Sequence, residues 1–265
     1  MRVIVVGAGL AGLSATESLA AAGVDVILLE AGHRFGGRTR TVSDGYINGQ
    51  YAESGAEWVD SIHWRMRELM QRFGIKPLGQ PMPWTTIRRW LYWDQAFYTA
   101  ENIATLSPGV FRAIEQYEAL ADSPASGVQD PSRPDLHPEA AYLDSISVAD
   151  LITQSGLDPV GQLFAGRDSQ GEFASDPENV SSLFVAQQRA FENSEVVKQG
   201  IELLSQRVAG GTGQIAISLG KQLQGSPRIT INFGTRLAAV EQDASGVVVT
   251  ADGPDGREIW QADAL

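Results

Sequence analysis

The alternation of hydrophobic and polar positions over the first thirty residues predicts a β-α-β unit. An uncharged, β-branched run at residues 3–6 indicates a buried parallel strand, because such strands are covered on both faces. A helical pattern follows over residues 13–22, and Gly23 ends it. Residues 24–29 form a second buried run that closes on Glu30. The chain is therefore expected to begin an α/β fold with two parallel strands.

Turn residues and caps predict the elements that follow. Asp44-Gly45 indicates a hairpin between residues 39–42 and 46–51, and Asp94-Gln95 indicates a second one in an aromatic stretch. Proline and N-cap signals place a mainly helical region in the middle of the chain. The expected helices are 62–73, 107–121, 147–154, 158–173, one that begins at 176, and 215–223; the expected late strands are 229–232, 235–242, 247–251 and 258–261.

Composition and charge narrow the class of protein. The chain has 265 residues, 43% hydrophobic and 20% charged, which suits a soluble globular protein of one or two domains. A net charge of −12 argues against nucleic acid or an anionic membrane as a partner. Met1 leads directly into the first strand and no apolar run could span a bilayer, so we expect a cytoplasmic protein.

Metal and nucleophile chemistry have no support in the sequence. Cysteine is absent, so there is neither a disulfide framework nor a thiolate metal site. The histidines at 33, 63 and 137 do not have metal-ligand spacing, and no Ser/His/Asp set is visible. His137 lies in a loop rich in Pro, Ser, Asp and Gly at residues 123–138, where we expect it to be solvated.

The turn after the first strand carries the strongest motif of the chain, Gly7-Ala8-Gly9-Leu10-Ala11-Gly12. Gly7 permits the tight turn, Gly9 lets a pyrophosphate approach the backbone, and Gly12 lets the helix pack close to the sheet. The phosphates would lie at the helix start, over Leu10 and Ala11, where free N–H groups and the helix dipole favour anions. Glu30 at the end of the second strand would accept hydrogen bonds from a ribose diol. Together these features predict a dinucleotide site.

The residues from Glu30 to Arg38, EAGHRFGGR, resemble the extended fingerprint of the FAD-dependent amine oxidase superfamily, which includes monoamine, polyamine and L-amino acid oxidases. The resemblance implies FAD as the cofactor and adds Ala31 and Gly37 to the cofactor-binding residues. Gly36 and Gly37 would let the backbone approach FAD, and Arg38 would place a guanidinium near its phosphates or flavin ring. The alternative is a surface loop with an unrelated arginine.

A second segment, ESGAEWVD at residues 53–60, resembles the part of the superfamily that contacts the flavin. Carried over by position, Gly55, Ala56, Glu57 and Trp58 would lie beside the flavin. Asp60 falls where polyamine oxidases often carry an acid or histidine that faces the substrate, so it is the candidate catalytic residue. It would hold a substrate ammonium or steer its deprotonation. The alternative is a helix N-cap or a solvated loop acid.

The same segment bears on the substrate. Venom-type L-amino acid oxidases often place an arginine just after the Gly-Ala pair, whereas this chain has Glu57-Trp58 there, which favours amines without a carboxylate. Arg65 and Arg67 fall on the expected helix 62–73 and are expected to be solvated. The aromatic residues Trp84, Trp90, Tyr92 and Trp93 either line an amine pocket or belong to the core of a second domain.

The resemblance implies an α/β fold in which a Rossmann-type, glutathione-reductase-like FAD-binding domain contains an inserted, mainly helical substrate domain. The expected boundaries are 1–75 with 205–265 for the FAD-binding domain and 76–204 for the substrate domain. Gly210-Gly211 would return the chain to the first domain, and the backbone of Leu237 would meet the adenine. The family pattern continues beyond residue 265, so we expect a complementary polypeptide that supplies the other half, and possible homo-oligomers.

The implied function is a flavin-dependent oxidoreductase that oxidises the carbon–nitrogen bond of an amine to an imine while O2 is reduced to hydrogen peroxide. The alternatives are an L-amino acid oxidase that is one chain of a processed enzyme, a desaturase-like or protoporphyrinogen-oxidase-like flavoenzyme, and a non-catalytic or truncated FAD-binding fragment. The expected partners are a small amine or amino acid and O2. No metal is expected.

Overall fold

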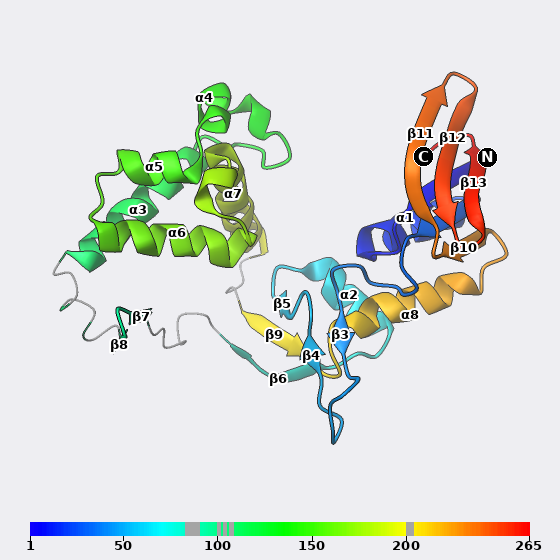
Figure 1. Cartoon of the computed structure of the whole chain (residues 1–265), viewed down its shortest axis with the longest axis horizontal. Helices are drawn as coiled ribbons and strands as arrows, with labels where there is room; N and C mark the ends of the chain where they lie inside the picture. The colour runs from blue at the N-terminus through cyan, green and yellow to red at the C-terminus, as the bar shows by residue number, and fades with distance from the viewer. Residues whose placement is uncertain (83–90, 100–101, 103–104, 106–108, 200–203) are drawn as a thin grey trace. The chain divides into compact units, whose positions relative to one another are not determined.

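The computed structural model describes residues 1–82, 91–99, 102, 105, 109–199 and 204–265 (Figure 1). The chain divides into two compact units. We call Met1–Met82 with Leu204–Leu265 the sheet unit, and Pro83–Leu203 the helical unit. The second unit is thus inserted in the sequence of the first.

A parallel sheet organises the sheet unit. Its strands β1 (Arg2–Val6), β2 (Asp25–Glu30) and β10 (Ile229–Phe233) have the order β1-β2-β10, and α1 (Leu10–Ala21) connects the first two. Each strand is parallel to its neighbour. A further parallel bridge joins Val3 of β1 to Ala264. The predicted β-α-β unit and its mixed α/β class are confirmed.

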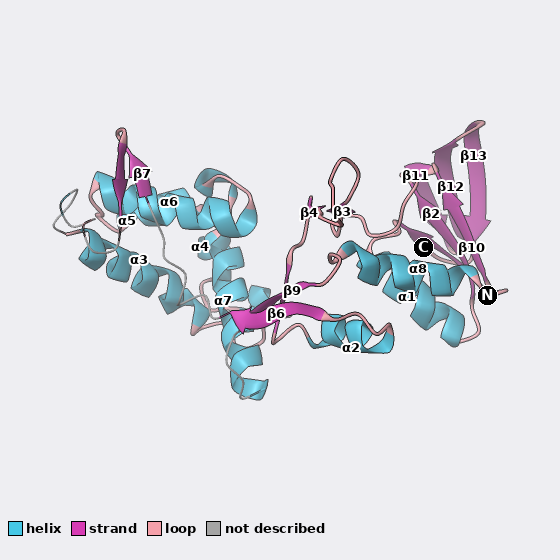
Figure 2. Ribbon diagram, turned by 90° about the horizontal axis from the view of Figure 1, so that it is seen from below, coloured by secondary structure: helices cyan, strands magenta, loops and turns pink. Residues whose placement is uncertain are grey.

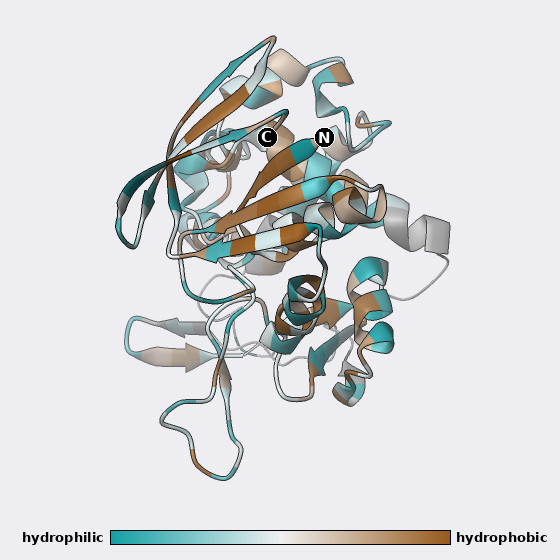
Figure 3. Ribbon diagram, turned by 90° about the vertical axis from the view of Figure 1, so that its right-hand side faces the viewer, coloured by the Kyte–Doolittle hydropathy of each residue, from teal (hydrophilic) through white to brown (hydrophobic). Residues whose placement is uncertain are grey.

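The parallel sheet is covered on both faces, which explains the apolar runs at residues 3–6 of β1 and 26–29 of β2. On one face Leu28 packs with α1 and with α8 (Gly213–Gln224), which lie side by side in Figure 2. On the other face Leu29 packs against an antiparallel sheet with the order β11-β12-β13. Those strands are β11 (Arg236–Asp243), β12 (Gly246–Gly253) and β13 (Gly256–Ala262). Figure 3 shows the apolar residues concentrated along the parallel strands.

A second sheet of the sheet unit carries part of the predicted site. The antiparallel strands β5 (Trp58–Asp60), β9 (Ser205–Val208) and β6 (Pro77–Met82) have the order β5-β9-β6. The helix α2 (Trp64–Arg72) packs beside them, and its Met70 shares an apolar cluster with Val59 and Val208. These strands bring residues near position 58 and position 207 together.

The predicted strand at residues 46–51 is wrong. The strand β3 (Thr41–Val42) pairs instead with β4 (Ala52–Glu53), and a loop connects them. Asn48 and Gly49 have φ angles of 55° and 72°, a left-handed conformation that an extended strand excludes. Ile47 is consequently 71% exposed.

Helices dominate the helical unit. They are α3 (Val110–Ala125), α4 (Ala140–Ser145), α5 (Val148–Gln154), α6 (Pro159–Phe173) and α7 (Ser182–Gln199), with 3₁₀ turns at Pro134–Leu136 and Pro177–Asn179 and a hairpin of β7 (Leu91–Trp93) and β8 (Ala96–Tyr98). Tyr117, Val148 and Leu157 belong to the main apolar core of this unit. In β7 and β8, Tyr92 contacts Phe97 and both rings are largely exposed, so this pair does not form a core. Trp84 and Trp90 lie outside the described residues.

The caps of α5 and α6 follow the sequence signals, but the start of α7 does not. Ser147 and Asp150 form a reciprocal capping box, and Asp158 caps α6. The helix expected from residue 176 begins instead at Ser182, after an extended Val180. Val180 is buried and its carbonyl accepts a hydrogen bond from the Val148 N–H, so pairing with the segment before α5 prevails over helix continuation.

His137 is buried, which contradicts the predicted solvated position. Its Nδ1 accepts the Glu139 N–H at 2.9 Å, so Nε2 carries the hydrogen that faces the Pro124 carbonyl at 3.1 Å. The ring thereby connects the following loop to the last turn of α3. A Cβ on Gly127 would lie 2.2 Å from Nε2, so only glycine leaves room for the ring there.

Candidate functional site

The turn between β1 and α1 leaves the start of the helix accessible to an anion. Gly7 has a φ of 94°, and a Cβ on Gly12 would lie 1.9 Å from the Gly7 carbonyl oxygen. Gly9 is the N-cap of α1, so no side chain caps the helix, and its first turn contains no acid. The N–H groups of the first turn, at Leu10 and Ala11, therefore meet no side-chain anion.

The predicted Gly-Gly-Arg loop lies directly beside this turn. The Gly36 N–H donates to the Ala8 carbonyl at 2.8 Å, and Gly36 forms a parallel bridge with Gly9. A Cβ on Gly37 would lie 3.4 Å from the Gly9 Cα. The Arg34 guanidinium donates to the Gly37 carbonyl at 2.6 Å and fixes the loop from outside. The Arg38 side chain is exposed.

The Gly-Ala segment pairs with the same loop. The Ala56 N–H donates to the Arg38 carbonyl at 2.9 Å, and the Ser54 N–H donates to the Arg40 carbonyl at 2.7 Å. A Cβ on Gly55 would lie 2.0 Å from the Arg38 carbonyl oxygen. Three segments that the sequence shows separately are thus adjacent, and the glycine at 55 is required by the neighbouring backbone.

Glu30 stands at the carboxyl end of β2 and supports the first turn. One carboxylate oxygen accepts the Ala8 N–H at 2.7 Å, and the other accepts the Gly32 N–H at 2.7 Å. A carboxylate oxygen has room for a second donor, so both oxygens remain available to a hydroxyl. Ala31 follows at the surface.

Leu237 enters this neighbourhood through its strand. The Thr235 N–H donates to the Glu30 carbonyl at 2.9 Å, just before β11 begins. The Leu237 side chain packs against the cluster that contains Leu29, and the β11–β12 register shifts between Leu237 and Ala239. Its backbone therefore lies beside the end of β2 in an irregular part of the ladder.

Glu53 connects distant segments through hydrogen bonds, a role that the sequence did not predict. Its carboxylate accepts the Thr212 N–H at 2.7 Å and the Thr41 hydroxyl at 2.8 Å. The Thr41 oxygen accepts the Gly213 N–H at 3.0 Å, and the Thr212 hydroxyl donates to the Ala56 carbonyl. The acid, which belongs to the predicted segment 53–60, thus joins the start of α8 to β3. Its position directly before Ser54-Gly55-Ala56 was the available signal.

Arg207 is a second missed residue. It lies opposite Trp58 in the β5–β9 pair, and its guanidinium carbon is 5.1 Å from the centroid of the Trp58 ring. The same guanidinium forms an ion pair with Glu57. The sequence gives no signal for this cluster, because Arg207 follows Trp58 by 149 positions in the chain.

Asp60 is the last residue of β5 and lies opposite Ser205. Its carboxylate accepts a hydrogen bond from the buried Ser205 hydroxyl, and its other oxygen is 3.9 Å from Nε2 of His63. The N-cap of α2 is His63, so Asp60 does not cap that helix. The side chain retains 22% exposure, which leaves it accessible on the same strand as Trp58.

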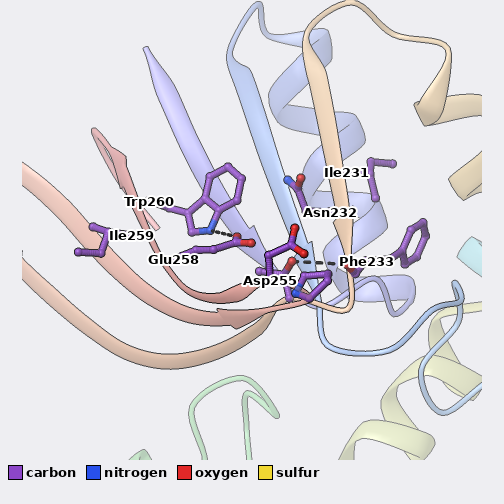
Figure 4. A pocket seen from close by; sticks show the side chains of 9 residues that line it. Ile231, Asn232, Phe233, Asp255, Glu258, Ile259 and Trp260 are labelled. Carbon is purple, nitrogen blue, oxygen red and sulfur yellow. Dashed lines mark hydrogen bonds between the residues drawn. The ribbon is translucent and has the colours of Figure 1, made fainter.

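A pocket of about 690 Å³ lies between β10 and the β12–β13 hairpin (Figure 4). Asn232 and Trp260 line it, and the Trp260 indole N–H donates to Glu258 at 3.1 Å. None of the predicted site residues lines this pocket.

No group of three or more possible His, Asp or Glu metal ligands occurs within the described ranges. Across those same ranges, every helix is too short or too polar to cross a bilayer.

Comparisons with known proteins point to a single family. The family model described as flavin containing amine oxidoreductase matches residues 10–265. The probable flavin-containing monoamine oxidase A of Dictyostelium discoideum is 25% identical over 257 residues, in an alignment that covers 94% of this chain and 54% of that protein. The L-amino-acid oxidase of Vipera ammodytes ammodytes is 26% identical over 281 residues, with 96% and 51% covered.

The solved structures agree at the level of the fold. Cyclohexylamine oxidase from Brevibacterium oxydans IH-35A superposes with a TM-score of 0.74 at 22% identity, over 99% of this chain and 56% of that chain. The chain therefore spans about half the length of the relatives that it matches.

Proposed function

This chain belongs to the flavin-containing amine oxidoreductase family, and we propose that it serves an FAD-dependent oxidase that converts the carbon–nitrogen bond of an amine to an imine. The observation that carries the proposal is the convergence of three glycine segments at an uncapped helix start. The Gly9–Gly36 bridge and the bond from Ala56 to Arg38 place these segments side by side.

The residues present fit the phosphate and ribose parts of FAD. The uncapped start of α1 suits a pyrophosphate, Gly7 and Gly9 keep side chains away from it, and Gly12 lets the helix pack close to the turn. Glu30 would accept a ribose hydroxyl with the lone pairs that its two backbone donors leave. Arg38 would add a positive charge, and the Leu237 backbone would meet the adenine.

When bound, FAD supplies the two-electron acceptor for the amine, and O2 takes those electrons on to hydrogen peroxide. The chain's own residues would position the substrate. Trp58 would line the substrate site, although one face of its ring already lies against the Arg207 guanidinium, and Asp60 on the same strand presents a carboxylate that would hold the ammonium. Gly55, Ala56 and Glu57 would form the wall beside the flavin.

The two compact units support the functional division expected from the sequence. We propose that the sheet unit is a Rossmann-type FAD-binding domain, and that the mainly helical insertion belongs to a substrate domain. The functional boundaries expected at 75 and 205 lie close to the ends of the sheet unit's two segments, Met82 and Leu204.

Two alternatives keep specific support. An L-amino acid oxidase is one, because a relative with that name matches over 96% of this chain. A chain that needs a complementary polypeptide, or that binds FAD without catalysis, is the other, because the relatives are about twice as long. We propose that a second polypeptide segment completes the active protein.

The proposal is tested by FAD binding and peroxide release in the purified protein. Titration of this chain should show FAD bound at one equivalent, and the complex of the chain with its complementary segment should release peroxide when a primary amine is added in air. Glu30→Gln should weaken FAD about tenfold, whereas Glu241→Gln on the exposed surface of β11 should not. Binding without peroxide from any amine or amino acid would favour the non-catalytic alternative, and absence of FAD binding would refute both.

A further inference from the structure

Glu57, Trp58 and Arg207 form a compact polar cluster at the edge of the proposed substrate site. A carboxylate oxygen of Glu57 contacts Nη2 of the Arg207 guanidinium, and the guanidinium lies over the Trp58 ring. The two charged side chains are 33% and 54% exposed, so a ligand in solution can reach them. The cluster is therefore accessible, although its arginine is already paired.

This pairing has a consequence for the class of substrate. An α-amino acid differs from the corresponding amine by a carboxylate, and a guanidinium binds a carboxylate best with two parallel N–H bonds. A substrate carboxylate that took two parallel N–H bonds from Arg207, one of them from Nη2, would compete with Glu57 and would bring two carboxylates close together. An amine brings only an ammonium, which this electrically neutral cluster accepts without such a cost.

We propose that the Glu57–Arg207 ion pair is the element that sets substrate class, because it shields the arginine from substrate carboxylates and so restricts the site to amines. The inference rests on the proposed function, which places Trp58 beside the substrate. It also makes Arg207 a latent carboxylate site. Because both partners are partly exposed, the shielding is worth a modest factor in affinity, about tenfold.

The chain contains a matched control for this cluster. On α2, Arg65 pairs with Glu68 at 3.1 Å and lies over the Trp64 ring at 3.8 Å. This second cluster has the same three residue types but lies outside the segments assigned to the site. Glu68→Gln therefore frees an arginine beside a tryptophan without altering the proposed site.

Direct binding of a carboxylate probe tests the shielding without any flavin. Benzoate would be titrated into the protein while the arginine Nε–H signals are followed by NMR, with Arg207→Gln used to assign the signal of Arg207. Glu57→Gln should bind benzoate at Arg207 about tenfold more tightly than the unmodified protein does, and Glu57→Gln with Arg207→Gln should lose that gain. Equal benzoate affinity at Arg207 in the unmodified protein and Glu57→Gln would overturn the inference.

Substrate preference in the FAD-loaded protein gives the second readout. The ratio of kcat/KM for L-phenylalanine to that for 2-phenylethylamine should rise about tenfold in Glu57→Gln and stay unchanged in Glu68→Gln. A ratio that stays constant in Glu57→Gln, or rises equally in Glu68→Gln, would overturn the role in specificity. Oxidation of neither compound by the unmodified protein would count against the proposed function, and the benzoate titration would still decide whether Glu57 shields Arg207.

Discussion

The sheet unit and the helical unit use their carboxylates differently. In the sheet unit, Glu30 and Glu53 each accept backbone N–H groups, and Glu53 binds one from a distant segment, Thr212. In the helical unit, Asp150 and Asp158 accept N–H groups at the start of their own helices. In the sheet unit, the two carboxylates thus fix loops that lack the hydrogen bonds of a strand or helix. Functional residues concentrate on such loops.

The glycines show the same contrast. In the sheet unit, Gly12 and Gly55 lie so close to neighbouring carbonyl groups that no side chain fits. In the helical unit, Gly171 has open space around it, and the close neighbour of Gly127 is a side chain, that of His137. The sheet unit is therefore built around close backbone approaches, whereas the helical unit relies on ordinary side-chain packing.

The largest expected difference in stability comes from comparing one glycine-to-alanine substitution in each unit. Gly12→Ala should destabilise the protein by about 3 kcal/mol or more, because its Cβ would meet the Gly7 oxygen at 1.9 Å. Gly171→Ala on α6 should stabilise it by about 0.5 kcal/mol, since a helical alanine loses less entropy. Urea unfolding followed by circular dichroism measures both. Equal effects of the two substitutions would remove the contrast between the units.

A smaller effect is expected when a carboxylate becomes an amide at a helix start. Glu53→Gln should cost about 1–2 kcal/mol, because the amide nitrogen cannot accept either hydrogen bond and one donor loses its partner. Asp158→Asn should change stability by a few tenths of a kcal/mol, since asparagine caps helices as well as aspartate does. The measurement is the urea midpoint of each variant. A near-neutral Glu53→Gln would show that α8 is held without this acid.

Local chemistry explains which features were predictable from the sequence. The β-α-β unit, the capped helix that starts at Ser147 and the glycine motifs depend on residues close together in the sequence, so they could be predicted. The predicted strand at residues 46–51 is wrong because Asp44-Gly45 suggested a tight hairpin, while the left-handed Asn48 and Gly49 break the second strand. The pattern of apolar and polar side chains does not reveal whether the backbone φ angle is positive or negative.

Long-range contacts account for what was missed. Arg207 reaches Trp58 only after the inserted helical unit returns the chain to β9, and Glu53 reaches Thr212 by the same route. His137 was expected in solvent because its loop is polar, yet two backbone groups bind its ring and Gly127 leaves space for it. Such partners depend on tertiary structure and leave no local signal.

In the helical unit the strongest charge effect should come from the link between α7 and α3. Hydrogen bonds to Glu118 and Asp122 hold the pKa of Arg189 above its usual value, although burial alone would lower it. Arg189→Met should cost about 1 kcal/mol, because both carboxylates are half exposed and stay hydrated. Thermal unfolding measures the loss. Arg133→Met breaks a pair with Asp135 in which both side chains are more than half exposed, and it should leave the midpoint unchanged. An equal shift in both variants would show that the burial of Arg189 contributes nothing.

The smallest effect tests whether the two units differ at the level of single motifs. The Ser147 N–H and hydroxyl lower the pKa of Asp150, and the Ser245 hydroxyl and N–H lower the pKa of Asp243 in the β11–β12 turn. Each carboxyl therefore takes up its proton at a higher pH in the unfolded chain, near 4, than in the folded chain. Its contribution is present above that pH and is lost as the pH falls through the lowered folded pKa. In Asp150→Asn and in Asp243→Asn, the melting temperature should fall less steeply as the pH is lowered below about 4, and the change should be similarly small in both variants. If the pH dependence of the melting temperature changes in one variant alone, the two units differ even in the hydrogen bonds made within a single motif. If it changes equally in both, the units differ only in contacts between segments that are distant in the sequence.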